Sequence, residues 1–520
     1  MTRALLLLSL AVTGFAADFD VLIRNGRVID GSGNPWFRAD VGLREGKIAA
    51  IGNLNGKSAG RAVDAANRVV TPGFIDVHTH VEGAVELNPM GANYLLDGVT
   101  TIVTGNCGGS RVDLKDWFGR LEQLKIGLNL ATLIGHNSVR REVMGTANRK
   151  ATDEEIVKMQ ALVDQAMRDG AVGFSTGLIY IPGTFSDTRE VVALAKAAGK
   201  YDAVYASHMR DEGDKVKAAI SEAVTVGREA GLRVEISHFK IDTPRIWGFS
   251  KETIAQVEEY RGQGVDVVVD QYPYDHSSTN LGITLPSWAL ADGQKAIEER
   301  LASTETRKRV AGEMKQRLAE LGHKDFSYAI VANYGADASL NGKNISQINR
   351  AAGRAATVDN EIETILQMIV KGGAQMVYHS MGMEDVERIL RYPNTAIASD
   401  GGIREFGSGM PHPRSYGTNA RVLAEFVGNR GTLTLEDAVR RMTSLPARTF
   451  GFRDRGLLRE GAAADVLIFD PAKVKDVSTY QDPHHYSEGF DYVFVNGEPV
   501  VIEGKLNEVR PGRILRHTAE

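Results

Sequence analysis

Two histidines stand one residue apart in the segment Ile75-Asp76-Val77-His78-Thr79-His80. Side chains alternate along a β-strand, so a strand at this place would present both imidazoles on one face. Two imidazoles on one face at the end of a strand can share a metal ion. The pair alone is a weak signal, because two hydrogen-bonded structural histidines produce the same pattern.

Two more histidines each end an apolar segment, Tyr205-Ala206-Ser207-His208 and Glu235-Ile236-Ser237-His238. Positions 208 and 238 differ by 30 residues, about the length of one strand–helix unit. Barrel enzymes keep their catalytic side chains at the C-terminal ends of their strands. Together with the first pair, these histidines predict a metal site at one end of a barrel.

Cys107 and Asp400 also follow apolar runs, Thr100–Asn106 and Thr395–Ser399. Cys107 is the only cysteine, so the chain can form no internal disulfide. A lone cysteine is often a small buried apolar residue, but thiolate is also a strong zinc ligand. The Asp400 carboxylate suits a general base or acid beside a metal-bound water, with a turn or helix-cap aspartate as the alternative.

The elements that must position these side chains alternate between short apolar strands and amphipathic helices, which predicts an α/β fold with a (β/α)8 TIM barrel. We expect barrel strands at Gly73–His80, Thr100–Asn106, Leu128–Gly135, Val172–Thr176, Val204–His208, Val234–His238, Val265–Tyr272 and Thr395–Asp400. A further strand candidate, Tyr328–Ala332, is assigned with the charged helical stretch Gln294–Leu321 to an insertion at residues 288–370, after the seventh strand. The candidate Gln375–His379 has no assigned place.

Both ends of the chain read as short strands joined by turns such as Asn25-Gly26 and Asn496-Gly497. Asn-Gly is a strong hairpin signal. We therefore expect a small β-sandwich domain built from residues 17–72 and 452–520, beside a barrel over residues 73–451.

The first 16 residues have the pattern of a secretory signal: a short positive start, an apolar run over Ala4–Val12, and small residues before Ala17. An N-terminal strand extension is the alternative. The apolar run is too short to span a bilayer, so we expect a periplasmic or secreted protein without a membrane anchor. The net charge of −5 lacks the basic surplus that nucleic-acid binding requires. Oligomeric state is not predicted.

These segments resemble the amidohydrolase superfamily, and within it the N-acyl-D-amino-acid deacylase (D-aminoacylase) branch. The resemblance covers about Asp20 to Leu506. The segment Val69–His80 is common to many amidohydrolases. More specific to this branch are the segments Gly105-Asn106-Cys107-Gly108, Ser207-His208-Met209-Arg210 and Pro411-His412-Pro413-Arg414.

The resemblance implies a zinc ion held tightly by Cys107, His208 and His238, a weaker second site at His78 and His80, and Asp400 as the acid/base. It implies that Cys107 replaces the bridging lysine or glutamate of other amidohydrolases, and the fourth predicted strand, Val172–Thr176, indeed contains neither residue. It also matches further residues to substrate binding: Lys240, Tyr272, Ser278 and Arg414 to positions that hold a substrate carboxylate, and Tyr180 to the lining of the site.

The function that these residues favour is zinc-dependent hydrolysis of N-acyl-D-amino acids, in which D stereochemistry follows from the resemblance alone. A dipeptidase cleaving before a C-terminal D-residue would use the same groups. A cyclic-amide hydrolase of the hydantoinase or dihydroorotase type is disfavoured by the missing bridging lysine, and a catalytically inactive binding protein by the six retained site residues. Two departures from the branch, Val81-Glu82 and the loop Gly401–Met410, concern the substrate more than the metal.

Overall fold

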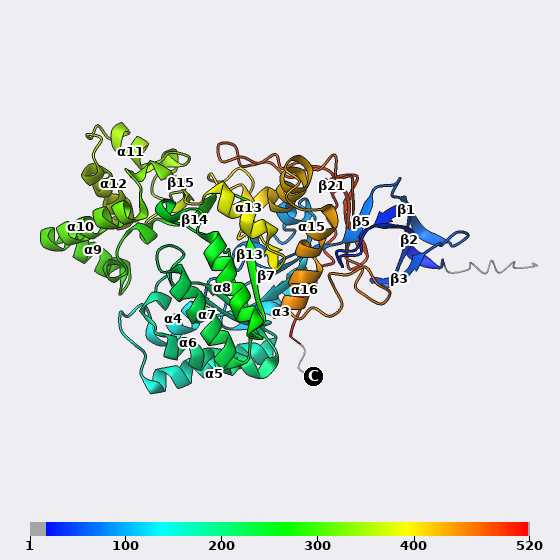
Figure 1. The fold of residues 1–520 in the computed structure, drawn as a ribbon, viewed down its shortest axis with the longest axis horizontal. Helices are drawn as coiled ribbons and strands as arrows, with labels where there is room; N and C mark the ends of the chain where they lie inside the picture. The colour runs from blue at the N-terminus through cyan, green and yellow to red at the C-terminus, as the bar shows by residue number, and fades with distance from the viewer. Residues whose placement is uncertain (1–16, 518–520) are drawn as a thin grey trace, which may run out of the picture.

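A computed structural model of the chain describes residues 17–517, so the predicted signal segment 1–16 lies outside the described residues. Figure 1 shows three parts along the long axis: strands from both chain ends, a barrel in the middle, and a mainly helical part around α10 and α12. Among residues 17–517, no helix combines the length and the apolar character needed to cross a membrane.

The barrel contains all eight strands expected from the sequence. They are β6 (Phe74–Asp76), β7 (Val99–Thr104), β8 (Asn129–Thr132) with its continuation β9 (Ile134–Gly135), β10 (Gly173–Gly177), β11 (Val204–His208), β12 (Arg233–Ile236), β13 (Val267–Gln271) and β17 (Thr395–Ile397). Neighbouring strands pair in parallel in the orders β6-β7-β8 and β9-β10-β11-β12-β13-β17. A parallel bridge between Thr79 and Gly401 closes the ring. The expected TIM-barrel fold is therefore confirmed.

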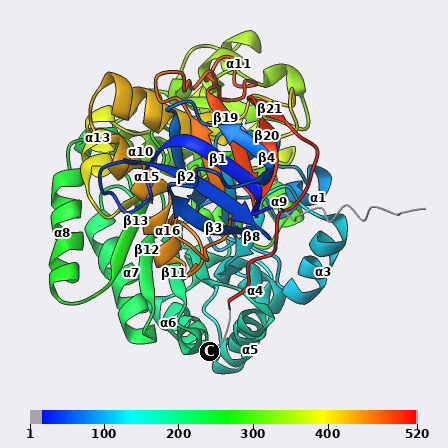
Figure 2. The same cartoon turned by 90° about the vertical axis from the view of Figure 1, so that its right-hand side faces the viewer.

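Helices surround the barrel and cover the outward faces of its strands (Figure 2). They are α1 (Ala84–Leu87), α2 (Ala92–Leu95), α3 (Leu114–Leu124), α4 (His136–Met144), α5 (Asp153–Asp169), α6 (Thr188–Ala198), α7 (Val216–Ala230), α8 (Ser250–Gly262), α13 (Met383–Arg391), α14 (Arg414–Arg421), α15 (Leu435–Met442) and α16 (Ser444–Thr449). Local sequence sets their ends: α5 begins with a capping box between Thr152 and Glu155 and stops at the left-handed Gly170.

The two chain ends together form one nine-stranded sheet. Its strands are β1 (Phe19–Val28), β2 (Phe37–Arg44), β3 (Lys47–Gly52), β4 (Ala59–Asp64), β5 (Val69–Pro72), β18 (Val466–Phe469), β19 (Phe490–Val495), β20 (Glu498–Ile502) and β21 (Lys505–Leu506). The halves meet where β18 pairs antiparallel with β5. The rings of Phe469 and Phe490 lie 6.3 and 6.0 Å from that of Phe74, so aromatic packing joins this sheet to the first barrel strand.

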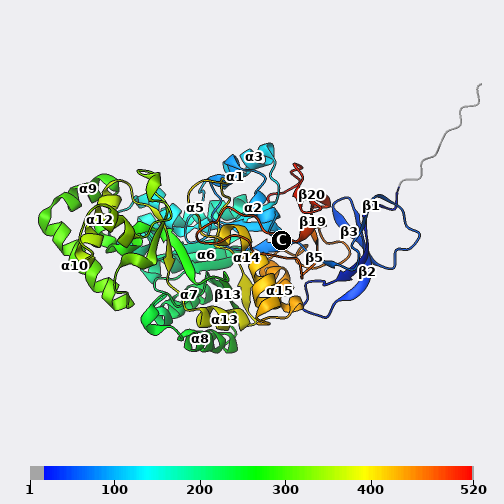
Figure 3. The same ribbon diagram turned by 90° about the horizontal axis from the view of Figure 1, so that it is seen from above.

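The part between β13 and α13 carries its own sheet and core, at the end of the molecule opposite the nine-stranded sheet (Figure 3). Its elements are β14 (His276–Asn280), α9 (Gln294–Ala302), α10 (Thr304–Leu321), β15 (Ala329–Asn333), α11 (Ile345–Ala351), α12 (Val358–Val370) and β16 (Gln375–His379). The three strands pair antiparallel in the order β14-β16-β15. The unplaced candidate Gln375–His379 is thus the central strand of this sheet, which extends past residues 288–370 on both sides.

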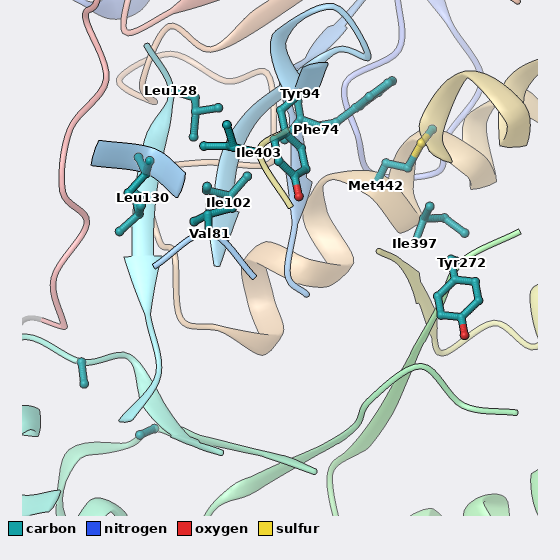
Figure 4. Packing of buried hydrophobic residues seen from close by; sticks show 14 of the residues in the cluster. Phe74, Val81, Tyr94, Ile102, Leu128, Leu130, Tyr272, Ile397, Ile403 and Met442 are labelled. Atoms are coloured by element: carbon teal, nitrogen blue, oxygen red, sulfur yellow. The ribbon is translucent and has the colours of Figure 1, made fainter. Parts of the chain in front are cut away.

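Barrel strands and surrounding helices share one large apolar core. Figure 4 shows part of it, where Ile102 and Leu130 from neighbouring strands lie beside Val81 and Ile403 from the segments at their ends. Each of these side chains is at most 4% exposed. Burial on this scale holds the strand ends in place, and with them the side chains they carry.

Candidate metal centre and active site

Cys107 lies at the centre of the predicted site. Its Sγ is 3.3 Å from Nε2 of His78, 3.6 Å from Nδ1 of His208 and 3.5 Å from Nε2 of His238. The facing nitrogens of His208 and His238 are 2.7 Å apart. One thiol and three imidazoles from four different strand ends therefore converge on one point inside the barrel mouth.

Asp400, the predicted general base, faces the two histidines that follow β6. Its Oδ1 accepts a hydrogen bond from Nε2 of His80 at 3.0 Å and lies 3.5 Å from Nε2 of His78. Its Oδ2 lies 2.9 Å from Nη1 of Arg414. Asp400 and His78 are buried, while His80 is partly open to solvent. All six residues predicted for the metal and its acid/base are thus brought together.

The donor atoms at this point fit a metal ion. Within the described residues, three sets of ligand atoms lie within 4.8 Å of one another: His78, His80 and Cys107; Cys107, His208 and His238; and His78, His238 and Asp400. Cys107 belongs to the first two sets, so one thiolate could serve two neighbouring ions. Imidazole and thiolate donors suit zinc, whereas magnesium and calcium prefer oxygen ligands.

Three site residues have a left-handed backbone, with φ of 51° at Cys107, 38° at His238 and 49° at Asp400. A non-glycine residue in such a conformation costs about 1–3 kcal/mol and persists where its surroundings enforce it. The three lie just beyond the ends of β7, β12 and β17. The chain therefore turns these side chains into the site at a cost in stability.

The loop that carries Cys107 is held by close packing of glycines. Gly105 and Gly108, which flank Asn106 and Cys107, both have positive φ. The Ser175 hydroxyl donates to the Gly105 carbonyl and accepts from the Gly108 N–H at 3.1 Å. A Cβ on Gly177 would lie only 2.1 Å from the Cys107 carbonyl oxygen. The Gly-Asn-Cys-Gly segment and the end of β10 therefore fit only with glycines at these places.

Two buried carboxylates to which the sequence analysis assigned no role hold the histidines. Asp270 Oδ2 lies 2.9 Å from Nδ1 of His78, and its Oδ1 accepts the His238 N–H at 2.8 Å. Glu212 Oε1 lies 3.0 Å from Nδ1 of His238 and accepts from Lys240 Nζ at 2.7 Å. Carboxylates of this kind orient metal-binding imidazoles. The position of Asp270 at the end of an apolar strand, level with the site, could have indicated its role.

The charges of the site favour the ionised forms of its nucleophilic and acidic groups. Burial alone would raise the pKa of the Cys107 thiol, but the positive charges of His78 and His238 outweigh burial and hold it well below its usual value. Burial would likewise raise the pKa of Asp400, but Arg414 and His78 hold that pKa well below the usual range. Both groups are therefore anionic near neutral pH, the form that binds a metal or accepts a proton.

A narrow cavity of about 90 Å³ opens from the centre toward the inserted part. His208, His238 and Asp400 line its inner end. Its outer wall comes from the inserted part, with Leu318 of α10 and Tyr378 of β16. The site is therefore shared between the barrel and the insertion.

The five residues predicted to contact substrate all lie at or beside this cavity. Tyr180, Lys240, Tyr272 and Ser278 line it. The Arg414 guanidinium lies over the Tyr272 ring, with Cζ 4.5 Å from the ring centroid. The Ser278 hydroxyl donates to a backbone carbonyl of β16 at 2.8 Å, so its hydrogen is already engaged.

The two segments that differ from the D-aminoacylase branch, Val81-Glu82 and Gly401–Met410, both lie at the rim of the site. Glu82 accepts from the Thr104 hydroxyl and from the Gly105 N–H, each at 2.6 Å, and so ties the segment after His80 to the loop before Cys107. The loop Gly401–Met410 reaches the insertion, where the Met410 N–H donates to a carbonyl of β15 at 2.7 Å.

Comparison with known proteins agrees with this geometry. Residues 61–501 match the model of the amidohydrolase family. The chain belongs to that family. It is 36% identical to an N-acyl-D-glutamate deacylase and 34% identical to a D-aminoacylase, both from Alcaligenes xylosoxydans xylosoxydans; each match covers 96% of this chain, with 97% and 98% of the relative. The predicted resemblance to the D-aminoacylase branch is confirmed.

Solved structures of D-aminoacylases and an N-acyl-D-glutamate deacylase also resemble this chain over its length. A crystal structure of D-aminoacylase superposes with a TM-score of 0.82 at 33% identity, covering 96% of this chain and 100% of the other. An N-acyl-D-glutamate deacylase from Bordetella bronchiseptica, in complex with zinc and a phosphonate inhibitor, superposes with a TM-score of 0.82 at 34% identity, covering 96% of this chain and 99% of the other. A D-hydantoinase at 18% identity, with a TM-score of 0.56, shares the fold. The chain is thus a metal-dependent hydrolase, as predicted.

Proposed function

We propose that the protein hydrolyses the amide bond of N-acyl-D-amino acids and releases a carboxylate and a free D-amino acid. The observation that carries this proposal is the cationic and hydroxyl group set beside the Cys107 centre: Lys240, Tyr272 and Arg414. Such a set binds a carboxylate by charge-assisted hydrogen bonds. The full-length similarity to N-acyl-D-glutamate deacylase and D-aminoacylase supports the same substrate class.

Zinc is the cofactor that we propose, held tightly by Cys107, His208 and His238, with a weaker second site at His78 and His80. A bound zinc ion supplies an activated water and a positive charge that polarises the amide carbonyl. A related D-aminoacylase is described as having a binuclear metal centre with one-metal activation and second-metal attenuation, which supports unequal roles for two sites.

Asp400 moves the proton in this proposal. Its carboxylate is ionised and faces His78 and His80, so it can accept a proton as water attacks the amide carbonyl. It then gives that proton to the departing amine nitrogen, which could not leave as an anion.

The carboxylate of the amino-acid half would bind at donors in or beside the cavity that opens toward the insertion, here called the first cavity. The buried Tyr272 hydroxyl has no hydrogen-bond partner within residues 17–517. Arg414 Nη1 lies close to Asp400 but donates no well-aligned hydrogen bond there. Lys240 adds a buried positive charge. Buried polar groups without partners are costly, so a bound carboxylate would stabilise Tyr272 and Arg414, whereas Lys240 is already paired with Glu212 and would add long-range attraction.

The side chain of the amino-acid half would then face the insertion. Met314, Leu318 and Leu321 of α10 line that wall. Asp242 and Arg317 also line the cavity, so its charged residues are of both signs. We therefore infer from the three α10 side chains that apolar D-amino acids are accepted at this wall.

A dipeptidase that cleaves before a C-terminal D-residue is the second candidate, because the same carboxylate-binding groups would serve it. A cyclic-amide hydrolase is disfavoured, since β10 offers no lysine or glutamate beside Cys107. Export to the periplasm or the medium is also proposed, on the signal-like pattern of residues 1–16 alone.

Measuring free amine released from a substrate panel would test the proposal. The panel contains N-acetyl-D- and N-acetyl-L-forms of alanine, leucine, methionine, phenylalanine, aspartate and glutamate, with matched dipeptides and a hydantoin. We expect zinc-dependent release from apolar D-substrates, about 100-fold faster than from their L-forms. Chelation should abolish the activity and added zinc should restore it. Turnover confined to the hydantoin or to L-substrates would overturn the proposal.

A further inference from the structure

A second cavity, of about 470 Å³, reaches the centre from the side of Cys107. It is separated from the first cavity by a wall that both share, formed by Ile179, Tyr180, Ile283 and Arg317. Three of the residues predicted to bind the carboxylate, Lys240, Tyr272 and Ser278, line the first cavity, and none of the three lines the second. A linear amide placed at the centre therefore has one half in each cavity.

The second cavity has three arginines and one acidic residue in its lining. Arg210 is neutralised by Glu222, with two hydrogen bonds of 2.9 Å. Arg141 of α4 donates one hydrogen bond, to a backbone carbonyl at 3.1 Å, and forms no ion pair with any residue from 17 to 517. Arg317 of α10 forms neither a hydrogen bond nor an ion pair within the same residues.

The single acid, Asp211, is engaged by the chain itself. Its Oδ1 accepts the N–H groups of Gly213 and Lys215 at 3.0 and 2.8 Å. Two guanidinium groups from helices far apart in the sequence thus remain free to bind an anion. Apolar side chains such as Ile181 and Leu290 complete the lining.

We propose that the second cavity binds the acyl half of the substrate and favours acyl groups that end in a carboxylate. This inference rests on the proposed function, because the first cavity must hold the amino-acid half. An acetyl group would fill only a small part of the second cavity. A short dicarboxylic acyl chain would place its methylene groups against the apolar walls and its far carboxylate near Arg141 and Arg317. Guanidinium groups bind carboxylates in a bidentate, charge-assisted manner.

The same charges disfavour dipeptide substrates. The acyl half of a dipeptide carries a free ammonium group, which would lie near two unpaired cations. Like charges at short range repel, most strongly where water is partly excluded. The cavity thus distinguishes N-acyl amino acids from dipeptides, which the carboxylate-binding groups of the first cavity cannot do.

The test varies only the acyl group, on whichever D-amino acid the wild-type enzyme releases fastest from the N-acetyl panel. The compared substrates carry a succinyl group, the uncharged succinamoyl group of nearly the same shape, and a glycyl group. Each is assayed with the zinc-loaded wild-type enzyme and with the Arg141→Gln/Arg317→Gln double variant. Lys308→Gln is the matched control, since it removes an exposed positive charge from α10 without lining either cavity.

We expect kcat/KM for the succinyl substrate to exceed that for the succinamoyl substrate by about threefold to tenfold, because Arg141 and Arg317 are exposed and would form solvent-screened ion pairs. The ratio should approach one in the double variant and stay unchanged in Lys308→Gln. The glycyl substrate should be the slowest with the wild-type enzyme.

A wild-type ratio at or below one, or a ratio that the double variant leaves unchanged, would overturn the inference while the proposed function stands. If the enzyme hydrolyses no N-acyl-D-amino acid at all, the proposed function fails, and this inference fails with it.

Discussion

At the scale of single residues, the site depends on a carboxylate and cationic side chains that lie close together and are buried from solvent. Asp400 is 8% exposed and has two histidines and Arg414 as its charged neighbours. A buried carboxylate remains ionised only when such partners compensate for the loss of water. That ionised state makes Asp400 suitable as a proton acceptor at neutral pH.

Asp400→Asn should therefore lower kcat by about 100-fold to 10,000-fold, because an amide cannot take up the proton. Metal content by elemental analysis should be unchanged, since Cys107, His208 and His238 remain. Asp470→Asn, the same change in a turn of the nine-stranded sheet, is the control and should keep its turnover. Near wild-type kcat in Asp400→Asn would rule out its proposed role.

At the scale of elements, short irregular segments beyond the strand ends aim the ligands. His78 and His80 were expected inside a strand, but β6 ends at Asp76 and both histidines follow it. They nevertheless reach the same centre, with ring centroids 5.4 Å apart. Hydrogen bonds between Asp270 and His78 and between Asp400 and His80 hold the two rings, so strand alternation alone does not set their orientation.

Gly177→Ala tests that packing at the end of β10. The added methyl group would collide with the Cys107 carbonyl, so the loop must shift, and we expect a loss of about 1–3 kcal/mol in stability together with a lower zinc content. Gly119→Ala, on α3 where nothing lies within 4 Å, is the control and should keep or slightly raise the melting temperature. Full zinc content in a folded Gly177→Ala enzyme would refute a need for this close approach.

At the scale of the whole molecule, the barrel supplies the centre and the insertion supplies the wall that the substrate meets. Residues of α10 and β16 form the wall of the first cavity that faces the metal ligands. The wall residues Leu318 and Tyr378 belong to a separate hydrophobic core within the insertion. Substitutions in the insertion should therefore alter substrate selectivity without altering the metal content of the enzyme.

Leu318→Ala should lower kcat/KM for N-acetyl-D-leucine or N-acetyl-D-phenylalanine by roughly tenfold, the effect of losing one apolar contact surface. The rate with N-acetyl-D-alanine, whose side chain is too short to use that wall, should change little. Leu301→Ala removes a buried leucine of the same insertion that does not line the cavity, and so controls for lost stability. Equal losses on all three substrates would refute a role in selectivity.

The sequence by itself determined the barrel and the identity of the residues at its active end. Each barrel strand is a short apolar run, and a parallel barrel brings the C-terminal ends of all its strands to one face. A histidine, cysteine or aspartate at the end of such a run must therefore lie near the others. His208, His238 and Cys107 could be grouped in this way without knowing any distance.

Only the tertiary structure decided what surrounds that group. Asp270 and Glu212 orient histidines on other strands, and Arg141 and Arg317 meet in one cavity although 176 positions separate them in the chain. Local sequence patterns predict which face of a helix or strand is buried, but they do not predict which distant element packs against that face. That choice is made when the barrel closes and the insertion packs over its end, because only then do side chains on separate elements share one space.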